Sequence, residues 1–204
     1  VSDWLLTSLK AFDTNETLDI ALTDGSVFTI KVTDAAVKVK ISEGGTWHTP
    51  TNGVITWYAD GDGELSNGWK NQYYVSYANF WSEDYTIYVT GAGNLTINIC
   101  PGAYAAGTDL KVNIAQININ GGAKVKIVMS KEFYTKGKTL TIQNADERTM
   151  FQVYDGSLEL RGDNDNGQKV TINGHASGEN HTDYPIINLN EPSDKLIVTD
   201  AIFK

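Results

Sequence analysis

The sequence has little of what disulfide-built, nucleic-acid-binding and membrane-spanning proteins need. Cys100 is the only cysteine among 204 residues, so an internal disulfide is excluded. Arg148 and Arg161 are the only arginines and the net charge is −9, so we expect no nucleic-acid partner. No run approaches the roughly 20 apolar residues that a membrane-spanning helix needs, so we expect no membrane insertion.

Helical periodicity is also scarce. One short amphipathic pattern at residues 3–12 predicts a helix that caps an open β-stack. No helical pattern of roughly 10–15 residues follows it, which argues against repeated βαβ units. Nucleophile-elbow, phosphate-binding and zinc-protease motifs are missing as well, so we favour a noncatalytic protein over an enzyme.

Short runs that alternate apolar and polar residues fill most of the chain. Residues 17–22, 27–32 and 37–41 form three such runs, and Asp24-Gly25 predicts a hairpin turn between the first two. From about residue 85 onward, short β-branched runs are separated by Gly, Asn and Asp. Many short strands with permissive corners are typical of a solenoid, in which each coil bends the chain several times. An antiparallel β-sandwich is the alternative.

The clearest coils lie in the last third of the chain, in runs at 139–144, 150–153, 156–162, 170–174 and 196–203. Their style of repeat resembles right-handed parallel β-helix segments of repetitive bacterial surface and adhesin-like proteins, which share a fold with pectate lyases. The resemblance extends more loosely over residues 85–138. It implies a secreted or cell-surface location and transfers no catalytic site.

We therefore predict an all-β protein in two parts. Residues 1–84 form an N-terminal β-rich, aromatic-rich segment, and residues 85–204 form a right-handed parallel β-helix that is continuous with the first part or separate from it. The last apolar run ends directly before Lys204. We expect the chain to be a piece of a longer protein.

Aromatic residues are concentrated in one stretch, since 11 of the 21 fall between Trp47 and Tyr88. Rings that face solvent in a row stack on sugar rings, whereas rings that face inward pack a junction between two β-substructures. We treat the first arrangement as a candidate glycan site, and its candidate ligand-binding residues are Trp47, Trp57, Trp69, Tyr73, Tyr77 and Trp81.

Calcium is the one cofactor for which the sequence offers a candidate site. Asp60, Asp62 and Glu64 alternate with glycines, and carboxylates at this spacing wrap hard cations. Asn71 stands where a full calcium loop carries its acidic twelfth residue. A solvated turn is the alternative, because Asp and Gly also build turns without a ligand.

These observations lead to one main expectation and two alternatives. We expect a noncatalytic segment of a secreted or cell-surface adhesin-like protein with a structural or interaction role, and extracellular glycans or cell-surface proteins as partners. The first alternative is a carbohydrate-binding or polysaccharide-active module that uses the aromatic belt between residues 47 and 88. The second is a self-assembling surface or filament subunit, whose partner is another copy of the chain.

Overall fold

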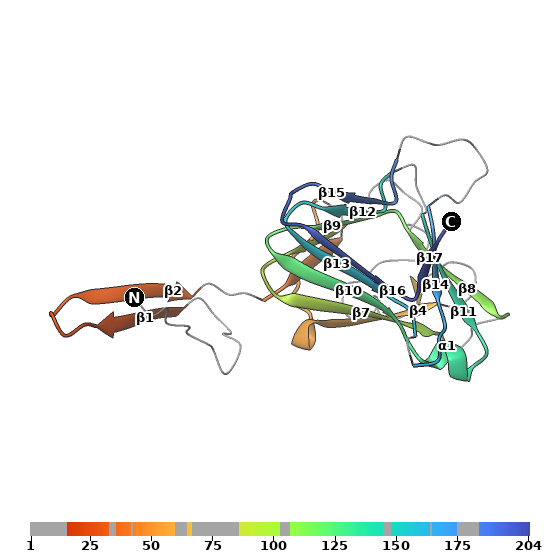
Figure 1. Ribbon diagram of the computed structural model, residues 1–204, viewed down its shortest axis with the longest axis horizontal. Coiled ribbons are helices and arrows are strands. Elements are labelled where there is room, and N and C mark those ends of the chain that lie inside the picture. The colour runs from red at the N-terminus through yellow and green to blue at the C-terminus, as the bar shows by residue number, and fades with distance from the viewer. Residues whose placement is uncertain are drawn as a thin grey trace. The chain divides into compact units, whose positions relative to one another are not determined.

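The computed structural model describes residues 16–32, 36–41, 43–59, 65–66, 86–102, 107–144, 148–163, 165–174 and 184–204. The chain divides into two compact units, Val1–Ala36 and Val37–Lys204. Nearly every described element is a β-strand (Figure 1), so the predicted all-β class is confirmed. The helix predicted at residues 3–12 lies outside the described residues.

The first unit holds an antiparallel hairpin. Strands β1 (Glu16–Ala21) and β2 (Val27–Val32) pair over their full lengths. Gly25 lies in the turn with a φ of +82°, and the Asp24 carboxylate accepts hydrogen bonds from the hydroxyl and the backbone N–H of Ser26. These bonds stabilise the charged carboxylate and lower the pKa of Asp24. The turn predicted at Asp24-Gly25 is therefore confirmed.

The second unit is a β-solenoid made largely of parallel strands. Four strand triplets follow one another, and each contributes one strand to each of three sheets (Figure 1). The triplets are β6 (Thr86–Thr90), β7 (Asn94–Pro101) and β8 (Asp109–Ile114); β9 (Gln116–Ile119), β10 (Ala123–Met129) and β11 (Thr139–Asn144); β12 (Phe151–Val153), β13 (Gly156–Arg161) and β14 (Val170–Asn173); and β15 (Ile187–Leu189), β16 (Lys195–Thr199) and β17 (Ala201–Phe203). The prediction of a parallel solenoid is confirmed, and the alternative of an antiparallel sandwich does not describe this unit.

The solenoid begins before the triplets. Strand β3 (Lys38–Ile41) pairs antiparallel with β6, and β4 (Val54–Ala59), which follows the 3-10 turn η1 (Thr51–Gly53), pairs parallel with β7. The short β5 (Leu65–Ser66) pairs antiparallel with β4. Strands on both sides of residue 84, where we expected a boundary, therefore belong to one unit.

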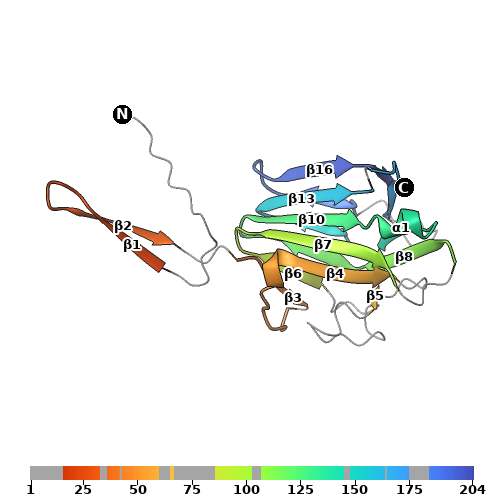
Figure 2. The same ribbon diagram turned by 90° about the horizontal axis from the view of Figure 1, so that it is seen from below.

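Three sheets result from this pairing. Sheet 1 has the order β3-β6-β9-β12-β15, sheet 2 the order β5-β4-β7-β10-β13-β16, and sheet 3 the order β8-β11-β14-β17. Figure 2 shows the strands of sheet 2 stacked from β4 to β16. Most strands alternate buried and half-exposed residues, as the period-two pattern predicts.

The core consists of columns of apolar side chains that run from coil to coil. In sheet 1 the register aligns Ile41, Ile87, Ile117, Phe151 and Ile187. The middle three are almost completely buried. Equivalent columns in the other two sheets contribute to the same core cluster. Each coil thus depends on its neighbours to bury its apolar face.

The corners differ in length while the register across the sheets is kept. In sheet 1, Thr86 pairs with Gln116, Ile117 with Phe151, and Phe151 with Ile187, which are offsets of 30, 34 and 36 residues. Extra residues are therefore accommodated in the corners. The inward side chains of the last triplet, which has no further strand paired beyond it among the described residues, are partly exposed, among them Leu189, Leu196, Val198 and Phe203.

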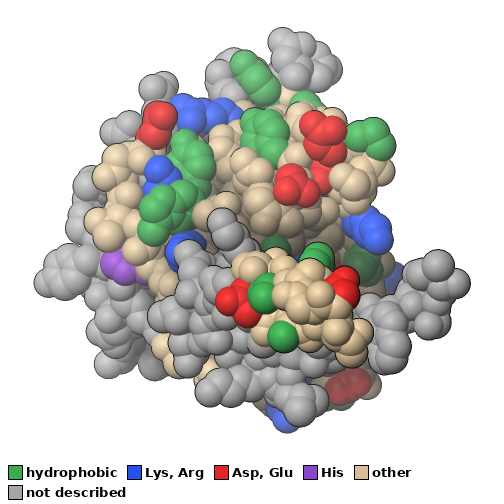
Figure 3. Space-filling model, turned by 90° about the vertical axis from the view of Figure 1, so that its left-hand side faces the viewer, with side chains coloured by type: hydrophobic (Ala, Val, Ile, Leu, Met, Phe, Trp, Pro, Cys, Tyr) green, Lys and Arg blue, Asp and Glu red, His purple; other side chains and the backbone are tan. Residues whose placement is uncertain are grey.

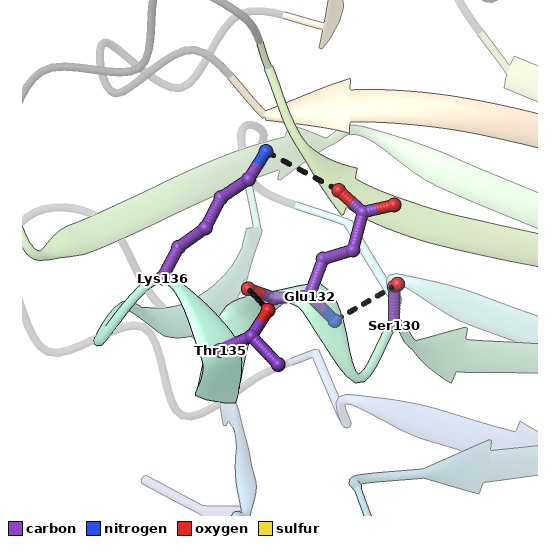
Figure 4. A network of polar contacts seen from close by, with 4 residues as sticks. All are labelled: Ser130, Glu132, Thr135 and Lys136. Atoms are coloured by element: carbon purple, nitrogen blue, oxygen red, sulfur yellow. Dashed lines mark hydrogen bonds and ion pairs between the residues drawn. The ribbon is translucent and has the colours of Figure 1, made fainter.

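One corner of the second coil contains the short helix α1 (Glu132–Thr135) (Figure 4). The Ser130 hydroxyl accepts a hydrogen bond of 3.2 Å from the Glu132 N–H, and Lys136 lies 3.2 Å from the Glu132 carboxylate. Phe133 is buried and attaches the helix to the core. These contacts are local and solvent-exposed, so they explain the shape of the corner rather than a binding function.

Candidate binding face

The outward side of sheet 1 carries a row of aromatic, basic and amide side chains. Strand pairing aligns one outward residue from each of the five strands, and the bridge between Val39 and His48 places Trp47 opposite Lys40 at the start of the row. We call this row the outer column, and its members in spatial order are Trp47, Lys40, Tyr88, Asn118, Gln152 and Asn188.

Lys40 holds the two aromatic rings of the outer column. Its ammonium lies 5.0 Å from the ring centroid of Trp47 and 4.9 Å from that of Tyr88, within the range of a cation–π interaction. The same ammonium donates a hydrogen bond to the carbonyl oxygen of Glu43, which fixes the turn before Trp47. A cation shared between two rings restricts their rotamers, so the rings are ordered before any ligand arrives.

Trp47 remains available to solvent, with 43% of its surface exposed. Figure 3 shows one face of the molecule, on which hydrophobic and basic side chains lie next to one another. An exposed indole fixed by a neighbouring cation is a suitable platform for a flat apolar ligand face.

The other end of the outer column is a network of amides. Gln152 Oε1 accepts hydrogen bonds from Asn188 Nδ2 at 3.1 Å and from Asn190 Nδ2 at 3.2 Å, and Asn190 also donates to the carbonyl of Val153 at 2.9 Å. The buried Asp194 carboxylate accepts the backbone N–H of Asn190 at 3.0 Å. The amides are therefore held in place by the next corner and still offer polar groups to solvent.

Asn118 lies between the aromatic end and the amide end. Its Oδ1 is shielded from solvent and accepts no hydrogen bond from any described residue. A shielded acceptor without a donor costs free energy.

The predicted aromatic belt is divided by the structure. Trp47 faces solvent, whereas Trp57 in β4 is completely buried beside Ile99 of β7. Trp57 therefore belongs to the core and offers no surface to a ligand. Trp69, Tyr73, Tyr77 and Trp81 lie outside the described residues.

Five members of the outer column were not among the predicted ligand-binding residues, namely Lys40, Tyr88, Asn118, Gln152 and Asn188. Asn118, Gln152 and Asn188 are half-buried outward positions of short strands, and Lys40 was recognised only as part of a strand. Alternation within each strand marks them as outward-facing. Their alignment depends on pairing over 30 to 36 residues, which alternation alone does not determine.

The predicted calcium ligands Asp60, Asp62 and Glu64 lie outside the described residues. Within the described part of the chain, no group of three or more His, Cys, Asp or Glu side chains is arranged to hold a metal ion. The calcium site therefore stays a prediction.

The outward side of sheet 2 has a different chemistry. Lys126 and Glu159 form an ion pair of 3.0 Å across β10 and β13. Cys100 in β7 is partly buried, and burial raises the pKa of its thiol, while a hydrogen bond with Ser130 opposes the shift. A thiol with a raised pKa is a weak nucleophile at neutral pH, so we assign Cys100 a structural role.

Comparisons with protein-family profiles, with curated proteins and with solved structures gave no significant match. Among the described residues, no helix is long and apolar enough to cross a membrane.

Proposed function

We propose that the chain is a noncatalytic, glycan-binding segment of a secreted or cell-surface adhesin-like protein, and that the outer column of sheet 1 binds the glycan. The observation that carries the proposal is the contact of the Lys40 ammonium with the exposed indole of Trp47 on one side and the phenol ring of Tyr88 on the other, which we call the Lys40 clasp. Sugars are bound by two kinds of group, and the outer column offers both. Aromatic rings stack on the face of the sugar ring, and amides form hydrogen bonds with the sugar hydroxyls.

The architecture supports this role. A solenoid is a stiff body whose outward side chains repeat at a fixed spacing, which suits a protein that displays a binding face away from its point of attachment. The acidic net charge of −9 favours solubility at this displayed position.

The test is a titration of the purified chain with soluble xylan, glucomannan, β-glucan, hyaluronan and mucin. Intrinsic tryptophan fluorescence and affinity gel electrophoresis are the two readouts. We expect a saturable response to at least one polysaccharide, and an affinity at least tenfold lower after Trp47→Ala. Tyr134→Ala is the matched control, because Tyr134 is an exposed ring on α1, which connects β10 of sheet 2 with β11 of sheet 3 and is not part of sheet 1.

Two results would overturn the proposal. One is the absence of any response across the panel in both readouts. The other is binding that Trp47→Ala leaves unchanged, which would locate the glycan elsewhere on the chain.

A further inference from the structure

We infer that the outer column binds an unbranched polysaccharide that lies parallel to the solenoid axis, across the strands rather than along them. This inference rests on the proposed function and adds the shape of the ligand and its direction. It follows from the dimensions of the face, from a second row of polar side chains beside the first, and from the order of chemistry along the column.

The face is long across the strands and narrow along them. Neighbouring strands lie about 4.8 Å apart, so the six positions from Trp47 to Asn188 span about 24 Å. Along the strand direction, β12 and β15 are only three residues long, and each presents a single outward residue, Gln152 or Asn188. A chain molecule laid along a strand would leave this surface almost at once, whereas one laid across the strands meets a new side chain at each step.

A second row runs parallel to the outer column. Pairing of Lys38 with Thr90 begins this row, and the residues directly after β9, β12 and β15 continue it, since the backbone N–H of each donates a hydrogen bond to the strand before it in sheet 1. Its members are Lys38, Thr90, Asn120, Tyr154 and Asn190. Tyr154 is 44% exposed, and Asn190 joins the two rows through its hydrogen bond with Gln152 Oε1. Two parallel polar rows define a track in the axial direction.

The two ends of the track offer different interactions. Trp47 and Tyr88 provide ring faces at one end, and Gln152 and Asn188 provide amide donors and acceptors at the other. Ring stacking contributes more per contact than one amide hydrogen bond that replaces a bond to water. Short oligosaccharides are therefore expected at the aromatic end, and only longer ones reach the amides.

The inference predicts how affinity depends on ligand length. The probes are linear cello-, xylo- and hyaluronan oligosaccharides of roughly two to eight sugar units, chosen so that the longest ones exceed the span of about 24 Å. Calorimetric titration should show affinity that rises with length and levels off once an oligosaccharide covers the column. Trp47→Ala should weaken every length at least tenfold, whereas Asn188→Ala should weaken only the longest ones, by about fivefold.

Asn98→Ala is the matched control, because Asn98 is a half-buried outward asparagine of β7 on sheet 2. Urea denaturation of each variant verifies that it is folded. Affinity that is independent of length, or long oligosaccharides that bind Asn188→Ala as tightly as the wild type, would overturn the axial arrangement. If the axial arrangement fails in one of these ways but Trp47→Ala still loses binding, the proposed function stands. If no probe and no polysaccharide binds, the axial arrangement and the proposed function are both overturned.

Discussion

The inward and outward columns of sheet 1 are built on the same five strands and obey opposite rules. The inward column is uniform, with isoleucine at four positions and Phe151 at the fifth. The outward column changes from an aromatic ring to a cation, then to a second aromatic ring and then to amides. The same strand register therefore aligns an inward column whose side chains are restricted by packing and an outward column whose side chains are free to differ in type.

The difference follows from the surroundings of the two rows. An inward side chain must fill a space bounded by the coils above and below and by two other sheets, so its volume and polarity are restricted. An outward side chain contacts mainly its neighbours in the row. Uniformity in the inward column thus follows from packing, whereas the outer column is free to carry the groups that the proposed function requires.

The largest expected effect is at the inward column. Phe151→Ala removes a fully buried ring in the middle of the column, and we expect the free energy of unfolding to fall by about 3–5 kcal/mol. Urea denaturation followed by circular dichroism measures this change. Tyr154→Ala, at an exposed position next to the same strand, should change stability by about 0.5 kcal/mol or less. Equal losses for the two variants would contradict the distinction between the columns.

An intermediate effect is expected at the corner that supports the amide end. Asp194 accepts backbone hydrogen bonds from Gly156 at 2.9 Å, Asn190 at 3.0 Å and Glu191 at 2.8 Å. Asp194→Ala leaves these donors without their acceptor, so we expect a loss of about 1–3 kcal/mol in urea denaturation. Asp155→Ala, at an exposed carboxylate, serves as the control. A change in Asp155→Ala as large as that in Asp194→Ala would show that the carboxylate network is not the cause.

A smaller effect on stability is expected in the outward column. Lys40→Met keeps the apolar stem between Trp47 and Tyr88 and removes the cation. The free energy of unfolding should therefore fall by only about 0.5–1 kcal/mol. The mobility of the indole should rise, which fluorescence anisotropy of the tryptophans detects. Lys124→Met, at an exposed lysine of sheet 2, is the control, and an identical anisotropy in the two variants would argue against the clasp.

The smallest effect is expected at the turn of the hairpin. The pKa of Asp24 is lowered from 3.8 because Ser26 stabilises the carboxylate. A lowered pKa means that the stabilisation is present above the ordinary value and is lost as the pH falls through the folded-state value. The chemical shift of the Ser26 amide should therefore titrate with a midpoint below 3.8, and Ser26→Ala should move the midpoint of Asp24 upward. A midpoint at or above 3.8 in the wild type would contradict the turn geometry.

The structural features that depend on residues close together in the sequence could be predicted from it. The turn at Asp24-Gly25 and the alternation of the short runs depend on local backbone preferences, and both are confirmed. Asn118 and Gln152 show why the candidate site was harder to predict. Each is a single polar residue between two apolar ones, and nothing in either run indicates that they become neighbours.

The aromatic belt shows a second limit. Trp47 and Trp57 are ten positions apart in the same aromatic-rich stretch, yet one faces solvent and the other lies in the core. Composition records that rings are abundant and gives no information about the side of the sheet on which each lies. The deciding fact is the pairing of β4 with β7, which aligns Trp57 with the buried Ile99 and so places its side chain in the core.

The unequal corners have a consequence for how such a chain can be altered. Coil lengths differ by several residues, yet the distance between successive members of the outer column is set by the hydrogen bonds of the sheet and stays near 4.8 Å. Loops can therefore be exchanged at the corners, and side chains replaced on the outer face, without changing the spacing between successive strands. By substitution of one outward side chain at a time, the outer face could be designed to bind a polymer whose repeat length matches a multiple of that spacing.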